Sequence, residues 1–178
     1  PDLRGHGLSS VPEEGYSLAL LAEDILHLCH DLDAVPFVLV GHSMGGMIAQ
    51  RYALGHPGDL AGIVLVATAA ADPENALVSK QIAAASPSED YRRSFLRHSA
   101  SWFTSNSDPE LVAWIEARML RTPEHVALSL VAAYEDMDVR RDLPSLDIPT
   151  LVIGALGDAS TPVDRSVELM RLIPGANL

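Results

Sequence analysis

Short apolar runs alternate along the chain with segments in which apolar residues recur at helical spacing. The runs cover residues 37–40, 62–67 and 151–154, and each has a Gly or Pro at or beside one of its ends. They are too short for independent helices and predict β-strands. Residues 37–40 contain four consecutive apolar side chains, which is typical of a strand buried on both faces of a sheet.

Helical patterns precede and follow the first of these runs. Leucine and isoleucine recur at helical spacing over residues 18–32, which predicts a helix with one apolar face. A second helix is predicted over residues 44–54, where Gly55-His56-Pro57 ends it. Strand 37–40, helix 44–54 and strand 62–67 together form a β-α-β unit. The sequence therefore predicts an α/β fold with a parallel sheet flanked by helices.

The middle of the chain changes character. Residues 69–142 lack strand signals, and helix starts such as Asp108-Pro109-Glu110 recur there. Four helices are expected, at 76–85, 89–102, 109–121 and 123–137. Inserted between parallel strands, they predict a helical cap (69–142) over the C-terminal edge of a core formed by 1–68 and 143–178. Five large side chains of this insert are candidates for lining a pocket, with simple packing within the cap as the alternative for each: Trp102, Phe103, Trp114, Met119 and Met137.

The segment that joins strand 37–40 to the next helix carries the strongest chemical signal. Its pattern is Gly41-x-Ser43-x-Gly45. A serine on a tight strand-to-helix turn projects its hydroxyl from the sheet edge, and the glycines two residues before and after it allow close approach. The backbone amide of Met44 then lies at a helix N-terminus and is a candidate oxyanion donor. The alternative is a glycine-rich turn with an incidental serine.

A carboxylate is expected at the same edge of the sheet. Asp158 follows strand 151–154 closely, and it is the best-placed candidate to orient a catalytic base. The alternative for Asp158 is an ordinary turn aspartate beside Gly157. Asp72, just past strand 62–67, is the second candidate.

None of the chain's histidines has an obvious place as the base. His42 adjoins Ser43, but neighbours on a turn point apart, so we expect it to pack beneath the turn. No histidine follows Asp158, and a triad would need a histidine beyond Leu178. The seven histidines are His6, His27, His30, His42, His56, His98 and His125.

Composition excludes several other functions. The net charge of −12 disfavours nucleic acid and anionic membranes as partners, and no apolar run approaches the ~18 residues of a membrane span. The single cysteine, Cys29, is interpreted as a buried structural thiol. No metal-ligand spacing and no phosphate-binding glycine loop occurs, so neither a metal nor another cofactor is expected. No signal peptide is visible, and a cytoplasmic location is expected. The sequence does not indicate an oligomeric state.

Taken together, these motifs resemble the α/β-hydrolase superfamily. Asp2-x-Arg4-Gly5-His6-Gly7-x-Ser9 resembles the loop after its fourth strand, and Gly41-His42-Ser43-Met44-Gly45-Gly46 resembles its nucleophile elbow. Residues 148–153 with Asp158-x-x-Thr161-Pro162 resemble its seventh strand and acid loop. The resemblance implies a triad order of Ser, Asp, His. It also implies an internal fragment whose core is incomplete at both ends, with the histidine and a second oxyanion donor outside the chain. Such a sheet would have an open edge and uncovered apolar surface.

The leading hypothesis is a serine hydrolase that cleaves an ester or lactone, a small-molecule substrate, through an acyl-enzyme intermediate. Ser43 would attack the acyl carbon, the Met44 amide would bind the oxyanion, and Asp158 would orient a histidine. The resemblance also leaves open a cofactor-free perhydrolase or haloperoxidase and a C–C bond hydrolase that use the same triad. A catalytically inactive fragment or ligand-binding relative is the remaining alternative.

Overall fold

The computed structural model describes residues 1–71, 96, 99–134 and 137–178. The chain divides into two compact units. The sheet unit comprises Leu18–Asp72 and Asp136–Leu178, and the helical unit comprises Pro1–Ser17 and Pro73–Glu135. The predicted division into a core of 1–68 and 143–178 and a cap of 69–142 stays a prediction.

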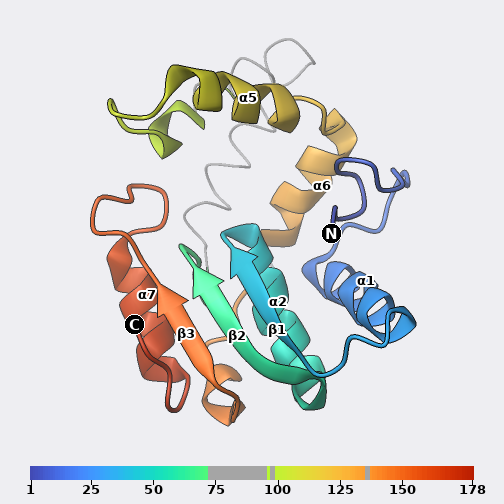
Figure 1. The fold of residues 1–178 in the computed structure, drawn as a ribbon, viewed down its shortest axis with the longest axis vertical. Helices are drawn as coiled ribbons and strands as arrows, with labels where there is room; N and C mark the ends of the chain where they lie inside the picture. Colours follow the sequence, from blue (N-terminus) through green and yellow to red (C-terminus); the bar gives the residue numbers. More distant parts are fainter. Residues whose placement is uncertain (72–95, 97–98, 135–136) are drawn as a thin grey trace. The chain divides into compact units, whose positions relative to one another are not determined.

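The sheet unit is built on three parallel strands in the order β1-β2-β3 (Figure 1). They are β1 (Phe37–His42), β2 (Leu60–Val66) and β3 (Thr150–Ile153). All three predicted strands are thus confirmed, and so is the parallel arrangement. In register, His42 lies beside Val66, and Val66 lies beside Ile153, so the three strands end at one edge. Beyond them, Asn177 forms a parallel bridge to Leu151.

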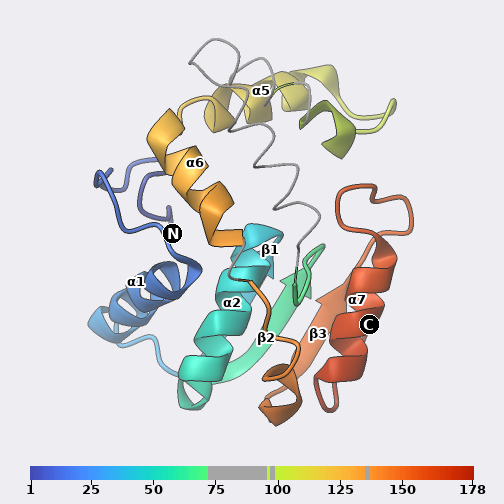
Figure 2. The same ribbon diagram turned by 180° about the vertical axis from the view of Figure 1, so that it is seen from behind.

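Helices cover one face of this sheet. They are α2 (Met44–Gly55) and α7 (Val163–Leu172), which lie in front of the strands when the molecule is seen from behind (Figure 2), while α1 (Leu18–Asp31) packs against α2. Short 3₁₀ turns, η1 (Pro57–Asp59) and η4 (Leu143–Ser145), precede β2 and β3. The covered face is apolar, because Ile63, Leu65 and Val152 are each at most 1% exposed. This burial of alternate residues along each strand fixes the register of the sheet.

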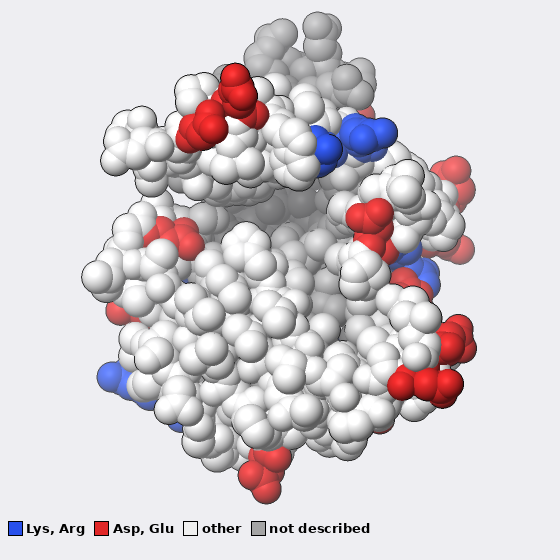
Figure 3. Space-filling view, viewed as in Figure 1, with Lys and Arg blue, Asp and Glu red and all other residues white. Residues whose placement is uncertain are grey.

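The opposite face of the sheet is open, and here one prediction was wrong. Residues 37–40 were expected to be buried on both faces, yet Val38 is 56% and Val40 63% exposed. Leu151 and Ile153 share this face and are also exposed. No charged side chain lies over these strands on the face shown in Figure 3. The apolar run therefore lies on a sheet face that no described residue covers.

Tyr52 anchors the end of α2 to its neighbours. Its ring is fully buried, and its hydroxyl donates a hydrogen bond to Oδ2 of Asp59 at 3.0 Å. His30 of α1 lies 2.8 Å from the same oxygen through Nε2. Burial, followed by the hydrogen bond to Asp59, raises the pKa of Tyr52, while the hydrogen bond from His30 lowers the pKa of Asp59. The Asp59 carboxylate, charged at neutral pH, thus links α1 to α2.

We expect Tyr52→Phe to lower the melting temperature at pH 7 by about 2–4 °C, because the ring still packs but one hydrogen bond is lost. The pKa of Asp59 is lower in the folded state, so its contribution is present above about pH 4 and is lost as the pH falls through the folded-state value. The difference between wild type and variant should therefore shrink in acid. Thermal unfolding followed by circular dichroism from pH 7 to 3 measures both effects, and a variant that melts with the wild type at pH 7 would contradict them.

The helical unit contains α5 (Pro109–Met119), α6 (Glu124–Ala133) and the 3₁₀ turn η2 (Ala100–Trp102). Asp108 caps α5 by accepting a hydrogen bond from the Glu110 amide at 2.9 Å, in agreement with the predicted Asp-Pro-Glu start. Two of the four predicted helices therefore exist, near 109–121 and 123–137. The helix predicted at 76–85 lies outside the described residues, as does most of the one predicted at 89–102.

Candidate active site

Ser43 occupies the turn between β1 and α2 in a conformation that L-residues rarely adopt. Its backbone has φ 51° and ψ −119°, and it lies at the N-cap of α2. The Ser43 amide donates to the Val66 carbonyl at 3.0 Å, which extends the β1–β2 pairing into the turn. A non-glycine residue at positive φ persists only where the surroundings hold it, and such residues cluster at functional sites. The strained serine predicted from the sequence is therefore present in the sheet unit.

The two glycines of the motif differ in what they do. A Cβ on Gly41 would lie 2.3 Å from the carbonyl oxygen of Gly45, so the chain must be bare there for the turn to close. A Cβ on Gly45 would have no atom within 4 Å. The expectation that both glycines are required by close approach is right for Gly41 and wrong for Gly45. The second crowded position is Gly46, where a Cβ would lie 2.5 Å from the Thr68 methyl carbon.

The leading backbone amides of α2 point toward the end of the helix at which Ser43 lies. The Ser43 carbonyl accepts the amides of Gly46 at 2.9 Å and Met47 at 3.3 Å, which closes the first turn. The amide of Met44 is one of the leading N–H groups of a helix, which have no partner within the helix. Together with the partial positive charge of the helix N-terminus, it is suited to stabilise an anion beside Ser43.

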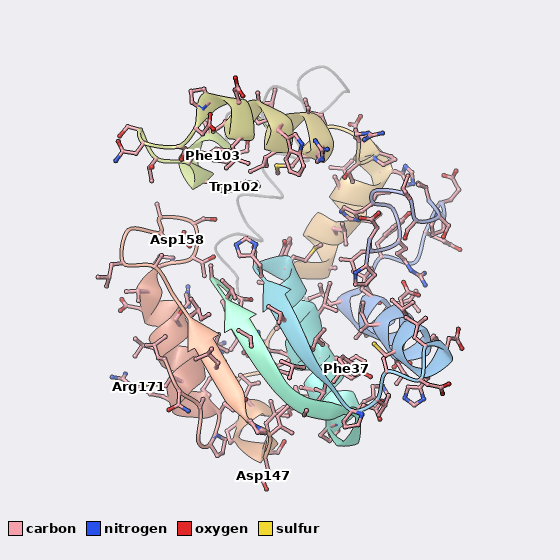
Figure 4. All side chains as sticks on the ribbon, in the orientation of Figure 1. Phe37, Trp102, Phe103, Asp147, Asp158 and Arg171 are labelled. Atoms are coloured by element: carbon pink, nitrogen blue, oxygen red, sulfur yellow. The ribbon has the colours of Figure 1, made fainter. Side chains whose placement is uncertain are left out.

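Asp158 lies in the loop that follows β3, at the same edge of the sheet as Ser43. Figure 4 shows it past the C-terminal end of β3, with Asp147 at the opposite end of that strand. Its Oδ1 accepts the amides of Ser160 at 2.9 Å and Thr161 at 2.8 Å. Among the described residues, none donates a hydrogen bond to Oδ2. Two strand spacings, about 9.5 Å, separate β1 from β3 at this edge.

The histidines of the sheet unit lie elsewhere. His42 is exposed on the open face that it shares with Val38 and Val40, so the prediction that it packs beneath the turn was wrong. It is exposed because no described residue covers that face. His56 follows the far end of α2, about 18 Å along the helix axis from Ser43, and lies 3.2 Å from Glu23. His30 is engaged by Asp59, and His27 is exposed on α1.

The loop motif near the N-terminus belongs to the helical unit. Asp2 accepts the Leu8 amide at 2.9 Å, and a Cβ on Gly7, which has positive φ, would collide with the Asp2 carboxylate. Ser9 donates to the Asp2 carbonyl at 2.7 Å. These residues close the loop on itself. His6 Nδ1 lies 3.1 Å from the Arg4 carbonyl.

Other candidates are not tested by the structure. Asp72 and His98 lie outside the described residues. Trp102 and Phe103 lie at the end of η2 (Figure 4), while Trp114 on α5 is 52% exposed and carries the Arg118 guanidinium 3.3 Å from its ring centre. Met119 is partly exposed and Met137 is buried. Their part in lining a pocket stays a prediction.

Two buried polar residues beside the turn were missed by sequence reasoning. Thr68 donates a hydrogen bond from Oγ1 to the Ser43 carbonyl at 2.8 Å. Gln50 on α2 donates from Nε2 to the carbonyls of Gly46 at 3.1 Å and Ala69 at 3.0 Å. The only signal for Thr68 is its place as the first polar residue after the apolar run of β2.

Residues 1–140 match the alpha/beta hydrolase fold family. The chain belongs to this family. The match includes the turn at Ser43, and the parallel sheet flanked by helices agrees with the fold. Within the part of this α/β hydrolase that the structure describes, no cluster of three or more metal-ligating side chains is found. The same residues include no helix long and apolar enough to cross a bilayer.

Known proteins similar to this α/β hydrolase include enzymes. It is 32% identical to the non-heme chloroperoxidase CPO-A1 of Kitasatospora aureofaciens, covering 99% of this chain and 70% of that protein. It is 30% identical to 3-oxoadipate enol-lactonase 2 of Acinetobacter baylyi (strain ATCC 33305 / BD413 / ADP1), covering 91% of this chain and 61% of that protein. The crystal structure of a hydrolase from Pseudomonas aeruginosa PA01 superposes with a TM-score of 0.86 at 32% identity, covering 98% of this chain and 67% of that one.

Proposed function

We propose that this α/β hydrolase is a serine hydrolase that cleaves an ester or lactone through an acyl-enzyme intermediate. The observation that carries the proposal is Ser43 itself, held at φ 51° between a parallel strand and the N-terminus of α2. This geometry sets a partly exposed serine beside the leading amides of a helix, which is the arrangement that acyl transfer requires. The similarity to an enol-lactonase supports a lactone or ester as the substrate class.

In the proposed reaction, the Ser43 Oγ attacks the acyl carbon while an imidazole takes the hydroxyl proton. The Met44 amide donates to the oxyanion of the tetrahedral intermediate. When the C–O bond breaks, the imidazolium returns that proton to the leaving oxygen, which departs as an alcohol. Water, deprotonated by the same imidazole, then attacks the acyl carbon. The bond from that carbon to Ser43 Oγ breaks, the imidazolium returns the proton to Oγ, and the carboxylic acid is released.

We assign the orientation of the imidazole to Asp158. Its Oδ1 is committed to the amides of Ser160 and Thr161, which fix the carboxylate in the loop. The second oxygen is the one that would accept the imidazole N–H. The separation of about 9.5 Å between β1 and β3 leaves room for a ring between the two side chains. His27, His30 and His56 of the sheet unit lie away from this edge, and His42, although it adjoins Ser43, is exposed on the open face of the sheet. We therefore expect this histidine from another part of the polypeptide.

Asp158→Asn should lower kcat for an aryl ester by about 10³-fold or more, because an amide cannot hold the imidazole in the required tautomer. The asparagine oxygen can still accept the amides of Ser160 and Thr161, so the loop should keep its shape. Asp147→Asn, at the opposite end of β3 and exposed, is the matched control and should leave kcat within about twofold. Steady-state kinetics of the full-length protein measures both. Equal activity of the two variants would remove Asp158 from the proposed triad.

A second candidate is perhydrolysis on the same residues, which the similarity to a non-heme chloroperoxidase favours. Hydrogen peroxide would then replace water in attacking the acyl-enzyme, and a peracid would leave. Comparing aryl-ester, lactone and peroxide-dependent turnover separates the two. Turnover that needs peroxide would favour perhydrolysis, whereas turnover in water alone supports the hydrolase.

A further inference from the structure

A buried hydroxyl links the turn at Ser43 to the chain that follows the next strand. Thr68 is 1% exposed and lies two residues after the end of β2. Its Oγ1 donates to the carbonyl oxygen of Ser43 at 2.8 Å. A buried threonine hydroxyl can bond within its own element, but this one joins two segments 25 residues apart. It therefore constrains the turn from outside the helix.

The bonded carbonyl and the Met44 amide are parts of one rigid group. The peptide between Ser43 and Met44 is trans and planar, so its C=O and N–H point in opposite directions. Fixing the carbonyl on the side of Thr68 therefore fixes the N–H on the other side. A hydrogen bond to the carbonyl also polarises the peptide and strengthens its N–H as a donor.

The other bonds to this carbonyl cannot do the same. They come from Gly46 and Met47, which turn together with the first turn of α2. Thr68 is held by a different part of the sheet unit, since the Ala67 amide before it donates to the Ile153 carbonyl at 2.8 Å. Thr68 therefore holds the strained turn in place relative to β3, whereas the bonds from Gly46 and Met47 hold it only relative to α2.

The fit around Thr68 leaves it little freedom. A Cβ on Gly46 would lie 2.5 Å from its methyl carbon and 2.7 Å from its hydroxyl oxygen. Gln50, fully buried, bonds both Gly46 and Ala69, the residue after Thr68. Thr68 thus packs tightly against Gly46 of α2, and Gln50 ties that helix to the residue that follows Thr68.

We propose that Thr68 is a positioning residue that aims the Met44 amide at the oxyanion; this inference rests on the proposed function of Ser43. Thr68 does not touch the substrate. Its hydroxyl holds the peptide plane so that the donor is already in place when negative charge develops on the acyl oxygen. Its loss should therefore raise the barrier to reaction more than it weakens substrate binding.

The test compares side chains of similar shape with and without the hydroxyl: wild type with Thr68→Val, and Thr68→Ser with Thr68→Ala. In the full-length protein, Thr68→Val keeps the shape of the side chain, and Thr68→Ser keeps the hydroxyl. With an aryl ester, Thr68→Val should lower kcat by about 10- to 100-fold with KM within about twofold, less than the loss of a whole oxyanion donor. Thr68→Ser should keep kcat within about threefold of wild type, which is rescue by the conservative variant.

Thr68→Ala provides a second comparison if Thr68→Val does not fold, since Ser and Ala at this position also differ by one hydroxyl. Wild-type kcat in Thr68→Val, or equal kcat in the Ser and Ala variants, would overturn the inference. A variant without the hydroxyl in which KM and the melting temperature both fall while kcat stays unchanged would overturn the inference too. Labelling of wild-type Ser43 by a fluorophosphonate separates the two proposals. Labelled wild type with unaffected variants overturns only the role of Thr68, whereas unlabelled wild type overturns the proposed function and this role with it.

Discussion

Ser43→Ala is expected to lower kcat for ester hydrolysis by at least about 10³-fold, since removing the nucleophile leaves only the contributions of binding and the oxyanion donor. The change deletes only Oγ. The backbone contacts that hold the turn, from the Ser43 amide to Val66 and from Thr68 to the Ser43 carbonyl, do not involve that atom. Alanine also tolerates φ 51° no worse than serine does. The variant should therefore fold normally, and its loss of activity can be assigned to chemistry.

The measurement combines kinetics with covalent labelling of the full-length protein. A fluorophosphonate should add to the peptide containing Ser43 in the wild type, as seen by mass spectrometry, and should fail to add in Ser43→Ala. Ser145→Ala is the matched control, because Ser145 is exposed in η4 at the other end of the sheet. It should keep both labelling and kcat. Turnover of Ser43→Ala within tenfold of wild type would rule out Ser43 as the nucleophile.

The parts of the fold that the sequence predicted are those encoded locally. The strand, the strained serine and the helix after it occupy one continuous stretch, residues 37–55, and each has its own signal. Apolar residues mark β1, Gly41 permits the turn, and the Gly55-His56-Pro57 sequence ends α2. Asp158 could also be placed from the sequence, because it follows β3 closely and the C-terminal ends of parallel strands lie at one edge of the sheet.

The parts that were missed depend on contacts between distant residues. The exposure of Val38 and Val40 depends on which other residues cover that face of the sheet. A run of four apolar residues does not contain this information. The role of Thr68 depends on a bond across 25 residues. The assignment of Gly45 as a crowded position failed because the motif does not reveal which atoms approach it. The turn brings the Gly45 carbonyl, rather than its Cα side, against Gly41.

The strained turn also makes a prediction about stability. Gly41→Ala should destabilise the fold by at least about 3 kcal/mol, because the new Cβ meets backbone atoms that cannot rotate away. The contacts would be 2.3 Å to the Gly45 oxygen, 2.5 Å to the Gly45 carbonyl carbon and 2.6 Å to the Gly46 Cα. Relief requires α2 to move away from β1, and this in turn would break the bonds that Ser43 and Thr68 make across the turn.

Gly45→Ala is the matched control, four residues along the chain in the same motif. Its Cβ would enter open space, and a helical alanine is more stable than glycine, so the change should be neutral or stabilising by up to about 1 kcal/mol. Urea unfolding of the full-length protein, followed by circular dichroism, gives both values at one pH. The opposite order, with Gly45→Ala the more damaging, would mean that the backbone of β1 and α2 does not approach as described. Since Ser43 lies in the turn that this approach closes, the comparison tests the turn independently of any substrate.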